Sequence, residues 1–348
     1  MAIKVLIVDD SFVVRRVLEE GLQRHPDIEV VATAQDPIFA MEKMEQDWPD
    51  VVILDIEMPR MDGISFLKQI MSTRPTPVIM CSSLVQSGAE ASVQALQMGA
   101  FAIIPKPKAA VRDFLESATD DLAGIVRAAA SSRIQKLVPV SNAAVPANLK
   151  SRPVQVGAGP DHIVAIGSST GGTQVLEMIF QALPSTAPGM VVVQQMHPEL
   201  VNTFAESLNR SLSLKVKVAE TGDVVRRGWV HLAPGGRHLS IENDGRCYRC
   251  IVKEGPLVSR NCPSVDVLFR SVAKEAGSNA TGIVLTGMGE DGARGLKEML
   301  DAGASTYAQD EESCVVPSMP REAVKHGGVG QVVTLGEIPW ILAGSRIG

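Results

Sequence analysis

The sequence predicts an α/β protein built from two doubly wound parallel-sheet domains that are joined by a linker. Its 348 residues are too many for one ordinary hydrophobic core. Short apolar runs alternate with segments of helical periodicity, which is the pattern of parallel sheets covered by helices. A basic stretch rich in Pro, Ser and Ala interrupts this alternation. We therefore expect a first domain at 1–124, a linker at 125–160 and a second domain at 161–348.

The composition predicts a soluble, cytoplasmic protein without membrane insertion. Hydrophobic residues make up 45% of the chain, yet no continuous apolar run is long enough to span a bilayer. The start MAIKVLIVDD lacks a signal-peptide pattern, because its apolar run is short and ends in two carboxylates. The five cysteines are scattered and odd in number, which disfavours a disulfide framework. Cys247 and Cys250 should lie on opposite faces of a hairpin strand after the turn NDG, which disfavours a metal or redox site.

Charge is distributed unevenly along the chain. Residues 125–160 contain five basic residues and no acidic residue, whereas both flanking domains carry net negative charge. Neither domain is basic and no DNA-reading motif is present, so the sequence disfavours nucleic-acid binding.

In residues 1–124, four strand-like apolar runs alternate with helical segments. The runs are KVLIV (4–8), VVIL (51–54), PVIMC (77–81) and FAII (101–104). Parallel strands bring their carboxyl ends to one edge of a sheet, so the polar residues that follow the runs should gather there. These residues are Asp9, Asp10, Asp55, Ser82 and Lys106.

Three carboxylates at one sheet edge repel one another unless a cation lies among them. Hard oxygen ligands in a partly hydrated pocket suit Mg²⁺. A nearby lysine and hydroxyl could then stabilise the charge on a transferred phosphoryl group. A set of solvated loop acids is the alternative, but it does not account for five polar groups at strand ends.

This domain resembles the receiver domain of two-component response regulators over its full length, which implies a (βα)5 fold with five parallel strands. The resemblance implies that Asp55, in LDIEMPRMDG, is the phosphorylated residue. It also implies a Mg²⁺ site and two groups that sense the phosphoryl group. The Mg²⁺ ligands would be Asp10, Asp55 and the backbone carbonyl of Glu57, with help from Asp9, and the sensing residues would be Ser82 and Lys106. Ile103 stands where receivers often have an aromatic switch residue.

The second domain begins with a strand and a helix joined by the turn GSSTGG, in HIVAIGSSTGGTQVLEMIFQAL. Glycines allow a sharp turn, and the helix N-terminus presents N–H groups that favour negative charge. A phosphate or dinucleotide could bind there, but neither G-x-G-x-x-G nor the Lys-containing P-loop pattern is present. The other interpretation is a serine nucleophile whose oxyanion binds those N–H groups.

A serine nucleophile needs a base and an orienting acid. VVVQQMHPEL supplies His197, between a buried strand and a helix that should begin at Pro198. GIVLTGMGEDGARGLKEML (282–300) is another strand–loop–helix unit, and its loop contains Glu290 and Asp291. The remaining histidines of this domain are His162, His231, His238 and His326.

Residues 161–345 resemble the catalytic domain of the chemotaxis protein-glutamate methylesterase family (CheB), and the order of domains also matches. The motifs GSSTGG, HLAPGGRHL, PSVDVLF, GIVLTGMGEDGA and SCVVPSMPREAV carry the resemblance. It implies that Ser169, rather than Ser168, is the nucleophile and that Asp291 is the acid. It also implies that Thr170 and the Met288 loop line the site and help to hold the oxyanion.

The chain departs from the family pattern at the base. Family members typically have Q-H-M-P where this chain has QQMH, so Gln195 stands at the base position and His197 two residues later. Asn261 also stands where a histidine is expected. Three alternatives remain: His197 acts as base after a loop adjustment, which we favour; the site is weakened or inactive; or another histidine, above all His238, is the base.

The resemblance implies a phosphorylation-activated hydrolase of chemotactic adaptation. It would remove methyl esters from receptor glutamates and deamidate receptor glutamines by a Ser-His-Asp mechanism. Its substrate would be the cytoplasmic helices of methylated chemoreceptors, and its phosphodonor the chemotaxis histidine kinase. Mg²⁺ would belong to the receiver, and hydrolysis itself would need no cofactor. The alternative is a phosphorylation-gated adaptor that binds receptor or kinase without chemistry.

Overall fold

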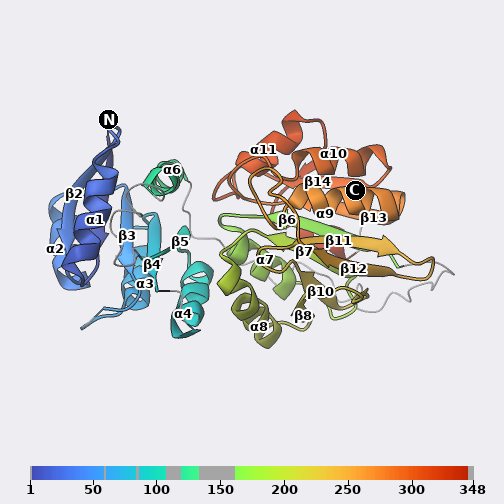
Figure 1. The fold of residues 1–348 in the computed structure, drawn as a ribbon, viewed down its shortest axis with the longest axis horizontal. Helices are drawn as coiled ribbons and strands as arrows, with labels where there is room; N and C mark the ends of the chain where they lie inside the picture. Colours follow the sequence, from blue (N-terminus) through green and yellow to red (C-terminus); the bar gives the residue numbers. More distant parts are fainter. Residues whose placement is uncertain (1, 59, 84–85, 107–118, 133–160, 344–348) are drawn as a thin grey trace. The chain divides into compact units, whose positions relative to one another are not determined.

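The chain divides into two compact units, residues 1–136 and residues 137–348 (Figure 1). The computed structural model describes residues 2–58, 60–83, 86–106, 119–132 and 161–343. Most of the predicted linker, from residue 133 to residue 160, lies outside the described residues. Within the described residues, no helix is both long and apolar enough to cross a bilayer.

The first unit contains a five-stranded parallel sheet with the strand order β2-β1-β3-β4-β5. The strands are β1 (Ile3–Val8), β2 (Ile28–Ala34), β3 (Val51–Asp55), β4 (Val78–Ser82) and β5 (Ala102–Pro105). The described helices are α1 (Phe12–Leu22), α2 (Pro37–Gln46), α3 (Gly63–Thr73), α4 (Gln86–Gln97) and α6 (Thr119–Ala130). This confirms the predicted parallel α/β sheet. The five strands agree with the predicted (βα)5 fold, although no residues had been assigned to β2, an edge strand whose residues are mostly half-buried.

Side-chain caps begin the first three helices close behind the strand ends. Ser11 accepts the Val14 N–H at the start of α1, and Asp62 accepts the Ser65 N–H at the start of α3. Asp36 accepts two N–H groups at the start of α2, where Pro37 opens the helix. The early caps keep the connecting loops short, so the polar residues stay near the carboxyl edge of the sheet.

The second unit contains a seven-stranded parallel sheet with the order β15-β14-β13-β6-β7-β10-β8. Its strands are β6 (Ile163–Ser168), β7 (Gly189–Gln194), β8 (Lys215–Val218), β10 (Trp229–Leu232), β13 (Ala280–Val284), β14 (Ser305–Gln309) and β15 (Gln331–Val333). The helices are α7 (Gly172–Gln181), α8 (Val201–Ser211), α9 (Val265–Ala276), α10 (Ala293–Asp301), α11 (Ser318–Lys325) and α12 (Ile338–Leu342), with short helices η3 (Pro198–Leu200) and η4 (Gly277–Asn279). This sheet also confirms the predicted α/β class.

The chain changes direction across the sheet between β6 and β13. After β6 it continues to β7 on one side, whereas β13 lies on the other side and is followed outward by β14. Loops at the carboxyl ends of the strands separate at such a switch point and leave room for a ligand. The predicted catalytic loops, after β6, β7 and β13, therefore lie around one position.

A small antiparallel sheet, β11-β12-β9, completes the second unit. Strands β11 (His238–Asn243) and β12 (Tyr248–Lys253) form the hairpin predicted at NDG, and β9 (Val224–Val225) pairs with β12. Cys250 is buried in the core of this unit, whereas Cys247 is half-buried, and neither forms a disulfide.

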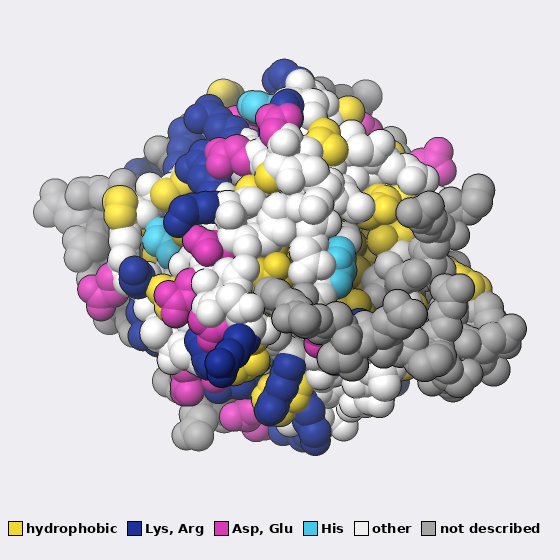
Figure 2. Space-filling view, turned by 90° about the vertical axis from the view of Figure 1, so that its right-hand side faces the viewer, with side chains coloured by type: hydrophobic (Ala, Val, Ile, Leu, Met, Phe, Trp, Pro, Cys, Tyr) yellow, Lys and Arg dark blue, Asp and Glu magenta, His cyan; other side chains and the backbone are white. Residues whose placement is uncertain are grey.

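Acidic and basic side chains are interspersed on the face of the molecule drawn in Figure 2.

We expect Gly167→Ala to destabilise the second unit. A Cβ at Gly167 of β6 would lie 2.2 Å from Val265 Cγ1 at the start of α9, so helix and strand would have to separate. Overpacking of this kind costs about 1–3 kcal/mol, which thermal unfolding of the full chain would measure. Gly336→Ala is the matched control, because nothing lies within 4 Å of its new Cβ. Equal melting temperatures for the two variants would contradict the proposed close packing.

Candidate functional site

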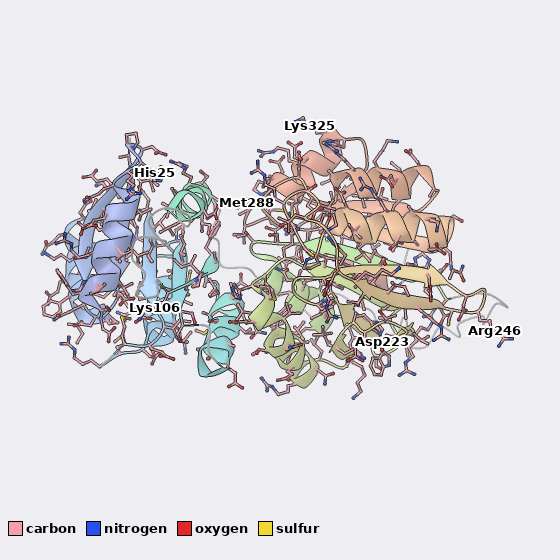
Figure 3. All side chains as sticks on the ribbon, in the orientation of Figure 1. His25, Lys106, Asp223, Arg246, Met288 and Lys325 are labelled. Carbon is pink, nitrogen blue, oxygen red and sulfur yellow. The ribbon has the colours of Figure 1, made fainter. Side chains whose placement is uncertain are left out.

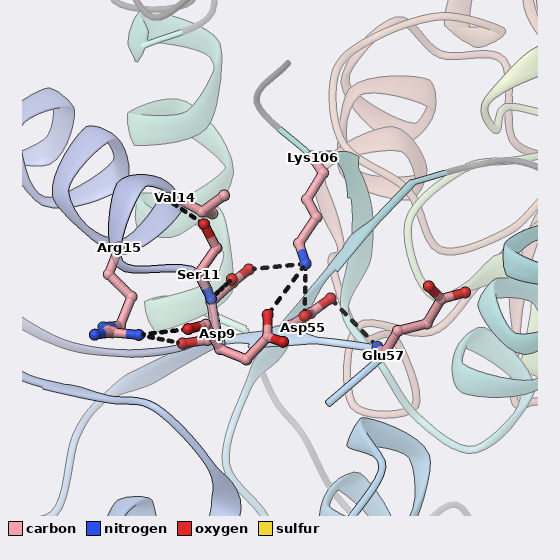
Figure 4. Close-up of polar contacts among 8 residues, drawn as sticks. Asp9, Ser11, Val14, Arg15, Asp55, Glu57 and Lys106 are labelled. Carbon is pink, nitrogen blue, oxygen red and sulfur yellow. Dashed lines mark hydrogen bonds and ion pairs between the residues drawn. The ribbon is translucent and has the colours of Figure 1, made fainter. Parts of the chain in front are cut away.

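Three carboxylates meet at the carboxyl edge of the first sheet (Figure 4). Asp9 and Asp10 follow β1, and Asp55 ends β3, the neighbouring strand. One oxygen of each carboxylate lies within 4.8 Å of the others. Asp9 and Asp55 are buried, whereas Asp10 is exposed. The structure thus brings together the three acids that the sequence predicted to meet.

Lys106 follows β5 and extends its ammonium group into this acidic cluster. Its Nζ lies 2.6 Å from Asp55 Oδ2, 3.4 Å from Asp9 Oδ2 and 4.0 Å from Asp10 Oδ1. Burial lowers the pKa of Lys106, but the hydrogen bond and charge of Asp55 outweigh it, so the pKa is raised overall. The lysine is therefore a permanent cation at the position where a phosphoryl group on Asp55 would place negative charge.

Burial raises the pKa of Asp55 to about 6, even though the Lys106 hydrogen bond opposes the shift. Burial raises the pKa of Asp9 as well. Asp9 Oδ2 is buried and accepts no hydrogen bond from the described residues. A second positive charge would relieve the desolvation of both acids. The oxygen-only donor set therefore fits a hard divalent cation such as Mg²⁺.

Two further predicted residues lie near this cluster. Ser82 ends β4 and is buried, and it accepts a hydrogen bond of 3.0 Å from the Ser92 hydroxyl. The backbone N–H of Glu57 donates to Asp55 Oδ1 at 3.3 Å. The sensing role of Ser82 and the metal-ligand role of the Glu57 carbonyl stay predictions. Ile103 is half-buried in β5 and packs against the core.

Ser168 and Ser169 differ sharply in their surroundings. Ser168 ends β6, is fully buried and donates to Gln194 Oε1 at 2.6 Å. Ser169 is half-buried, and its backbone is fixed on both sides. Its N–H donates to the Thr286 carbonyl at 3.1 Å, and its carbonyl accepts from Gln194 Nε2 at 2.8 Å. Of the two hydroxyls, that of Ser169 is the one open to a substrate.

Asp291 is a buried carboxylate at the N-terminus of α9. Its Oδ1 accepts from Ser264 Oγ at 2.7 Å and from the Asp266 N–H at 3.0 Å. Its Oδ2 accepts from the Val265 N–H at 2.8 Å. Burial raises the pKa of Asp291, and these hydrogen bonds oppose the shift. The favourable field of a helix N-terminus also holds the charge in place.

Gln195 completes the shell of Asp291. Its Nε2 donates to Asp291 Oδ2 at 2.7 Å, and its backbone N–H donates to the Ser168 carbonyl at 2.9 Å. The side-chain amide of Gln195 thus lies beside Asp291, at the position where the family pattern has the base. An amide nitrogen of this kind donates hydrogen bonds and does not accept a proton at accessible pH.

His197 lies at the N-cap of η3, and Pro198 opens that helix as predicted. The side chain is half-buried, and its Nδ1 is buried without a hydrogen-bond partner among the described residues. No hydrogen bond in the described part of the chain joins it to Ser169 or Asp291. Its role as base therefore stays a prediction.

The alternative base, His238, is fully engaged. Its Nδ1 accepts the Ser264 N–H at 3.2 Å, and its Nε2 lies 2.9 Å from the Pro256 carbonyl. Breaking either bond would leave a buried polar group unpaired, which costs about 1–3 kcal/mol. The structure therefore favours a positioning role for His238, at the start of the helix that holds Asp291.

Thr170 and Met288 border the serine from two loops. The Thr170 carbonyl accepts from Thr286 Oγ1 at 3.0 Å. Met288 is 44% exposed and follows Gly287, at which a Cβ would lie 2.8 Å from Ser169 Cβ (Figure 3). The loop after β13 thus passes directly over the serine, as a site-lining loop must. The oxyanion role of the two residues stays a prediction.

Two residues that hold the second site together, Gln194 and Ser264, were not predicted from the sequence. The Gln194 side chain accepts a hydrogen bond from Ser168 Oγ and donates to the backbone carbonyls of Ser169 and Gln195. Ser264 caps α9 and donates to Asp291. The Ser264 signal was present, since a serine before VDVLF is a typical N-cap. For Gln194, a glutamine at the end of a buried strand was the available hint.

We expect Mg²⁺ binding to the full chain to weaken as the pH falls through about 6. The raised pKa of Asp55 means that its carboxyl takes up a proton there, and a protonated carboxyl is a poor ligand. Calorimetric titration should give about tenfold lower affinity at pH ~5 than at pH ~7. Asp121→Asn, which removes an exposed carboxylate of the same unit, should keep this pH dependence. A pH-independent affinity would refute the assignment.

Comparisons with known proteins identify both domains. The family model described as CheB methylesterase matches residues 164–342, and the response regulator receiver domain model matches residues 5–116. The protein-glutamate methylesterase/protein-glutamine glutaminase 1 of Chromobacterium violaceum is 52% identical over 358 residues, covering 99% of this chain and 100% of the relative. The protein of the same name from Pseudomonas savastanoi pv. phaseolicola is 53% identical over 346 residues, 97% of each chain.

A solved structure supports the assignment of the second unit. The crystal structure of the Thermotoga maritima CheB methylesterase catalytic domain has 34% sequence identity and a TM-score of 0.51, and it covers 53% of this chain and 98% of its own. The family match extends over more than half of the chain, and the curated relatives match it almost end to end. The chain belongs to the CheB methylesterase family and carries a response regulator receiver domain before its methylesterase domain.

Proposed function

We propose that this protein hydrolyses the γ-methyl esters of glutamates in chemoreceptors, and deamidates receptor glutamines, under control of its receiver domain. The observation that carries the proposal is the end-to-end similarity to protein-glutamate methylesterase/glutaminases. Ester hydrolysis releases methanol, amide hydrolysis releases ammonia, and both leave a glutamate carboxylate. The proposed order is receiver, linker and hydrolase, in a cytoplasmic protein. The receiver extends past the expected boundary at residue 124, because helix α6 (Thr119–Ala130) belongs to the first unit.

In the receiver, Asp55 is the proposed phosphoryl acceptor and a histidine kinase the donor. Asp9, Asp10, Asp55 and the Glu57 carbonyl would hold Mg²⁺, which neutralises charge on the transferred phosphoryl group. The ammonium group of Lys106 already lies 2.6 Å from Asp55 and would pair with that group. Ser82, at the end of the adjacent strand β4, would respond to the same charge. Phosphorylation would thereby change the surface of the receiver and relieve the inhibition of the hydrolase.

In the hydrolase, Ser169 Oγ would attack the ester carbonyl and pass its proton to a base. The base would return the proton to the methoxide, which leaves as methanol. Water would then attack the acyl-enzyme, release the glutamate carboxylate and restore the serine. N–H groups near Thr170 and the Met288 loop would stabilise the oxyanion, which is worth about 3–4 kcal/mol per donor in related chemistry.

The proton acceptor is the step at which this chain differs. Asp291 is positioned to orient a base. The side chain hydrogen-bonded to it at that place is Gln195, whose amide cannot take a proton. We propose His197 as the acceptor, because its Nδ1 is unpartnered and it lies two residues beyond Gln195. A modest rate is expected, since within the described residues no hydrogen bond joins the imidazole to Ser169 or Asp291 and its side chain does not cap η3.

Ser169→Ala should abolish methanol release from methylated receptor. Loss of the nucleophile removes the covalent step, so the rate should fall by about 10³-fold or more. Ser185→Ala, which changes an exposed serine of the same unit, is the control. The measurement is release of labelled methanol by the phosphorylated full chain.

The same variant separates the enzyme from an adaptor. The amide beside Asp291 is the observation that favours a binding protein without chemistry. If wild type and Ser169→Ala restored chemotactic adaptation equally in cells, and neither released methanol, the adaptor function would replace the proposed one.

His197→Ala should reduce kcat by about 10²- to 10⁴-fold, the usual value of general-base help. Adding Gln195→His to that variant should restore activity, because the new imidazole would take the hydrogen bond to Asp291 that Gln195 makes now. Gln181→His, on the exposed face of α7, is the matched control and should restore nothing. An unchanged kcat in His197→Ala would show that His197 is not the base.

A further inference from the structure

A cavity of about 570 Å³ lies beside the loop that carries Met288 and Asp291. Three segments line it: a turn before α9, the loop after β13, and helix α11. The lining residues are Ser259, Arg260, Gly289, Glu290, Ser318 and Glu322. None of them has a part in the proposed hydrolytic steps.

The turn that presents Arg260 is strained. Val258 and Asn261 exchange two backbone hydrogen bonds, of 3.0 Å and 2.9 Å, across a turn of only two residues. Both residues of the turn, Ser259 and Arg260, have positive φ angles, of 48° and 65°. Asn-Gly or Asp-Gly usually occupies such a turn, because other residues pay a steric cost there. Neither residue of this strained turn is a glycine, which indicates that the Arg260 side chain has a function.

Surrounding hydrogen bonds hold the strained turn in place. Asn261 Nδ2 donates to the Ser259 carbonyl at 2.7 Å, and Ser259 Oγ donates to Asp266 Oδ2 at 3.4 Å. The chain then runs directly to Ser264, whose hydroxyl binds Asp291. The backbone of Arg260 is therefore fixed relative to the acid of the catalytic site, which suits a residue that positions a substrate.

Arg260 is an unpaired cation in the lining of the cavity. Within the described residues it forms no ion pair, and its side chain is exposed. Of the two glutamates in the lining, Glu322 is already held by Lys325 at 3.3 Å. Glu290 is exposed and makes no ion pair in the described part of the chain. The guanidinium is thus free to form the forked pair with a carboxylate for which its geometry is suited.

We propose that Arg260 is a specificity-determining residue that binds a carboxylate side chain of the protein substrate, next to the glutamate on which Ser169 acts. This inference rests on the proposed function for the identity of the substrate. The cavity accommodates the acidic side chain, and the Arg260 guanidinium supplies the donors that bind it. The rigid turn then holds the substrate segment in register with the serine.

The test compares the binding of two peptides to the full chain in the Ser169→Ala background, which prevents turnover. One fluorescent helical peptide carries a glutamate methyl ester flanked by glutamates, and its partner carries glutamines at the flanking positions. The acidic peptide should bind about fivefold more tightly, the upper range for an exposed ion pair. Arg260→Ala should remove this preference.

Arg246→Ala is the matched control, since it removes an equally exposed arginine from the far end of the same unit (Figure 3). It should keep the fivefold preference. Arg260→Gly guards against misfolding, because glycine suits a φ of 65° and should not lower the melting temperature. If Arg260→Gly or Arg260→Ala kept the preference for the acidic peptide, or if the parent chain showed none, the proposal would be overturned.

Activity measurements separate this proposal from the proposed function. With the catalytic serine restored, Arg260→Ala should raise KM for the acidic methyl-ester peptide about fivefold and leave kcat nearly unchanged. Absence of methanol release from the wild-type chain would refute the proposed hydrolysis, while the peptide affinities would still decide the role of Arg260. A fall in kcat at constant KM would overturn the binding role.

Discussion

The second unit depends on the buried carboxylate of Asp291. Four donors surround it: Ser264 Oγ, the N–H groups of Val265 and Asp266, and Gln195 Nε2. They come from the start of α9 and from the end of β7, while Asp291 itself follows β13. One charge therefore joins three segments that are distant in the sequence. Removing a donor would leave a buried charge under-satisfied, which is costly in a low-dielectric interior.

This dependence explains how an amide can stand beside the acid without harm to the fold. Asp291 needs a hydrogen-bond donor at that place, and Gln195 supplies one at 2.7 Å. A neutral imidazole would supply the same donor and in addition accept a proton from a serine. The two side chains are therefore similar for stability but different for chemistry. Substitution at residue 195 can alter the rate of hydrolysis while the site keeps its shape.

Local sequence pattern was enough to predict both parallel sheets. It also predicted the group formed by Asp9, Asp10, Asp55 and Lys106, because strand ends in a parallel sheet converge by topology alone. The residues of edge strand β2 could not be assigned from the sequence, because its half-buried residues show no clear apolar run. The bond between Gln195 and Asp291 also escaped, since it joins residues 96 positions apart and depends on side-chain geometry. Local pattern could not separate Ser168 from Ser169 either, since their difference lies in burial.

The two sites show how the number of fixed donors decides what a buried carboxylate can do. Asp291 accepts four hydrogen bonds, so both of its oxygens are committed and its role is to hold and orient. Among the described residues, Asp55 accepts hydrogen bonds from the Glu57 N–H, at 3.3 Å, and from the ammonium group of Lys106. Its charge is therefore stabilised mainly by the Lys106 ammonium group, and burial still raises its pKa to about 6. An acid held in this way keeps oxygen lone pairs available for a metal ion and for a phosphoryl group. The carboxyl edge of a parallel sheet can thus present either a structural or a reactive carboxylate. The donors contributed by neighbouring loops determine which of the two it is.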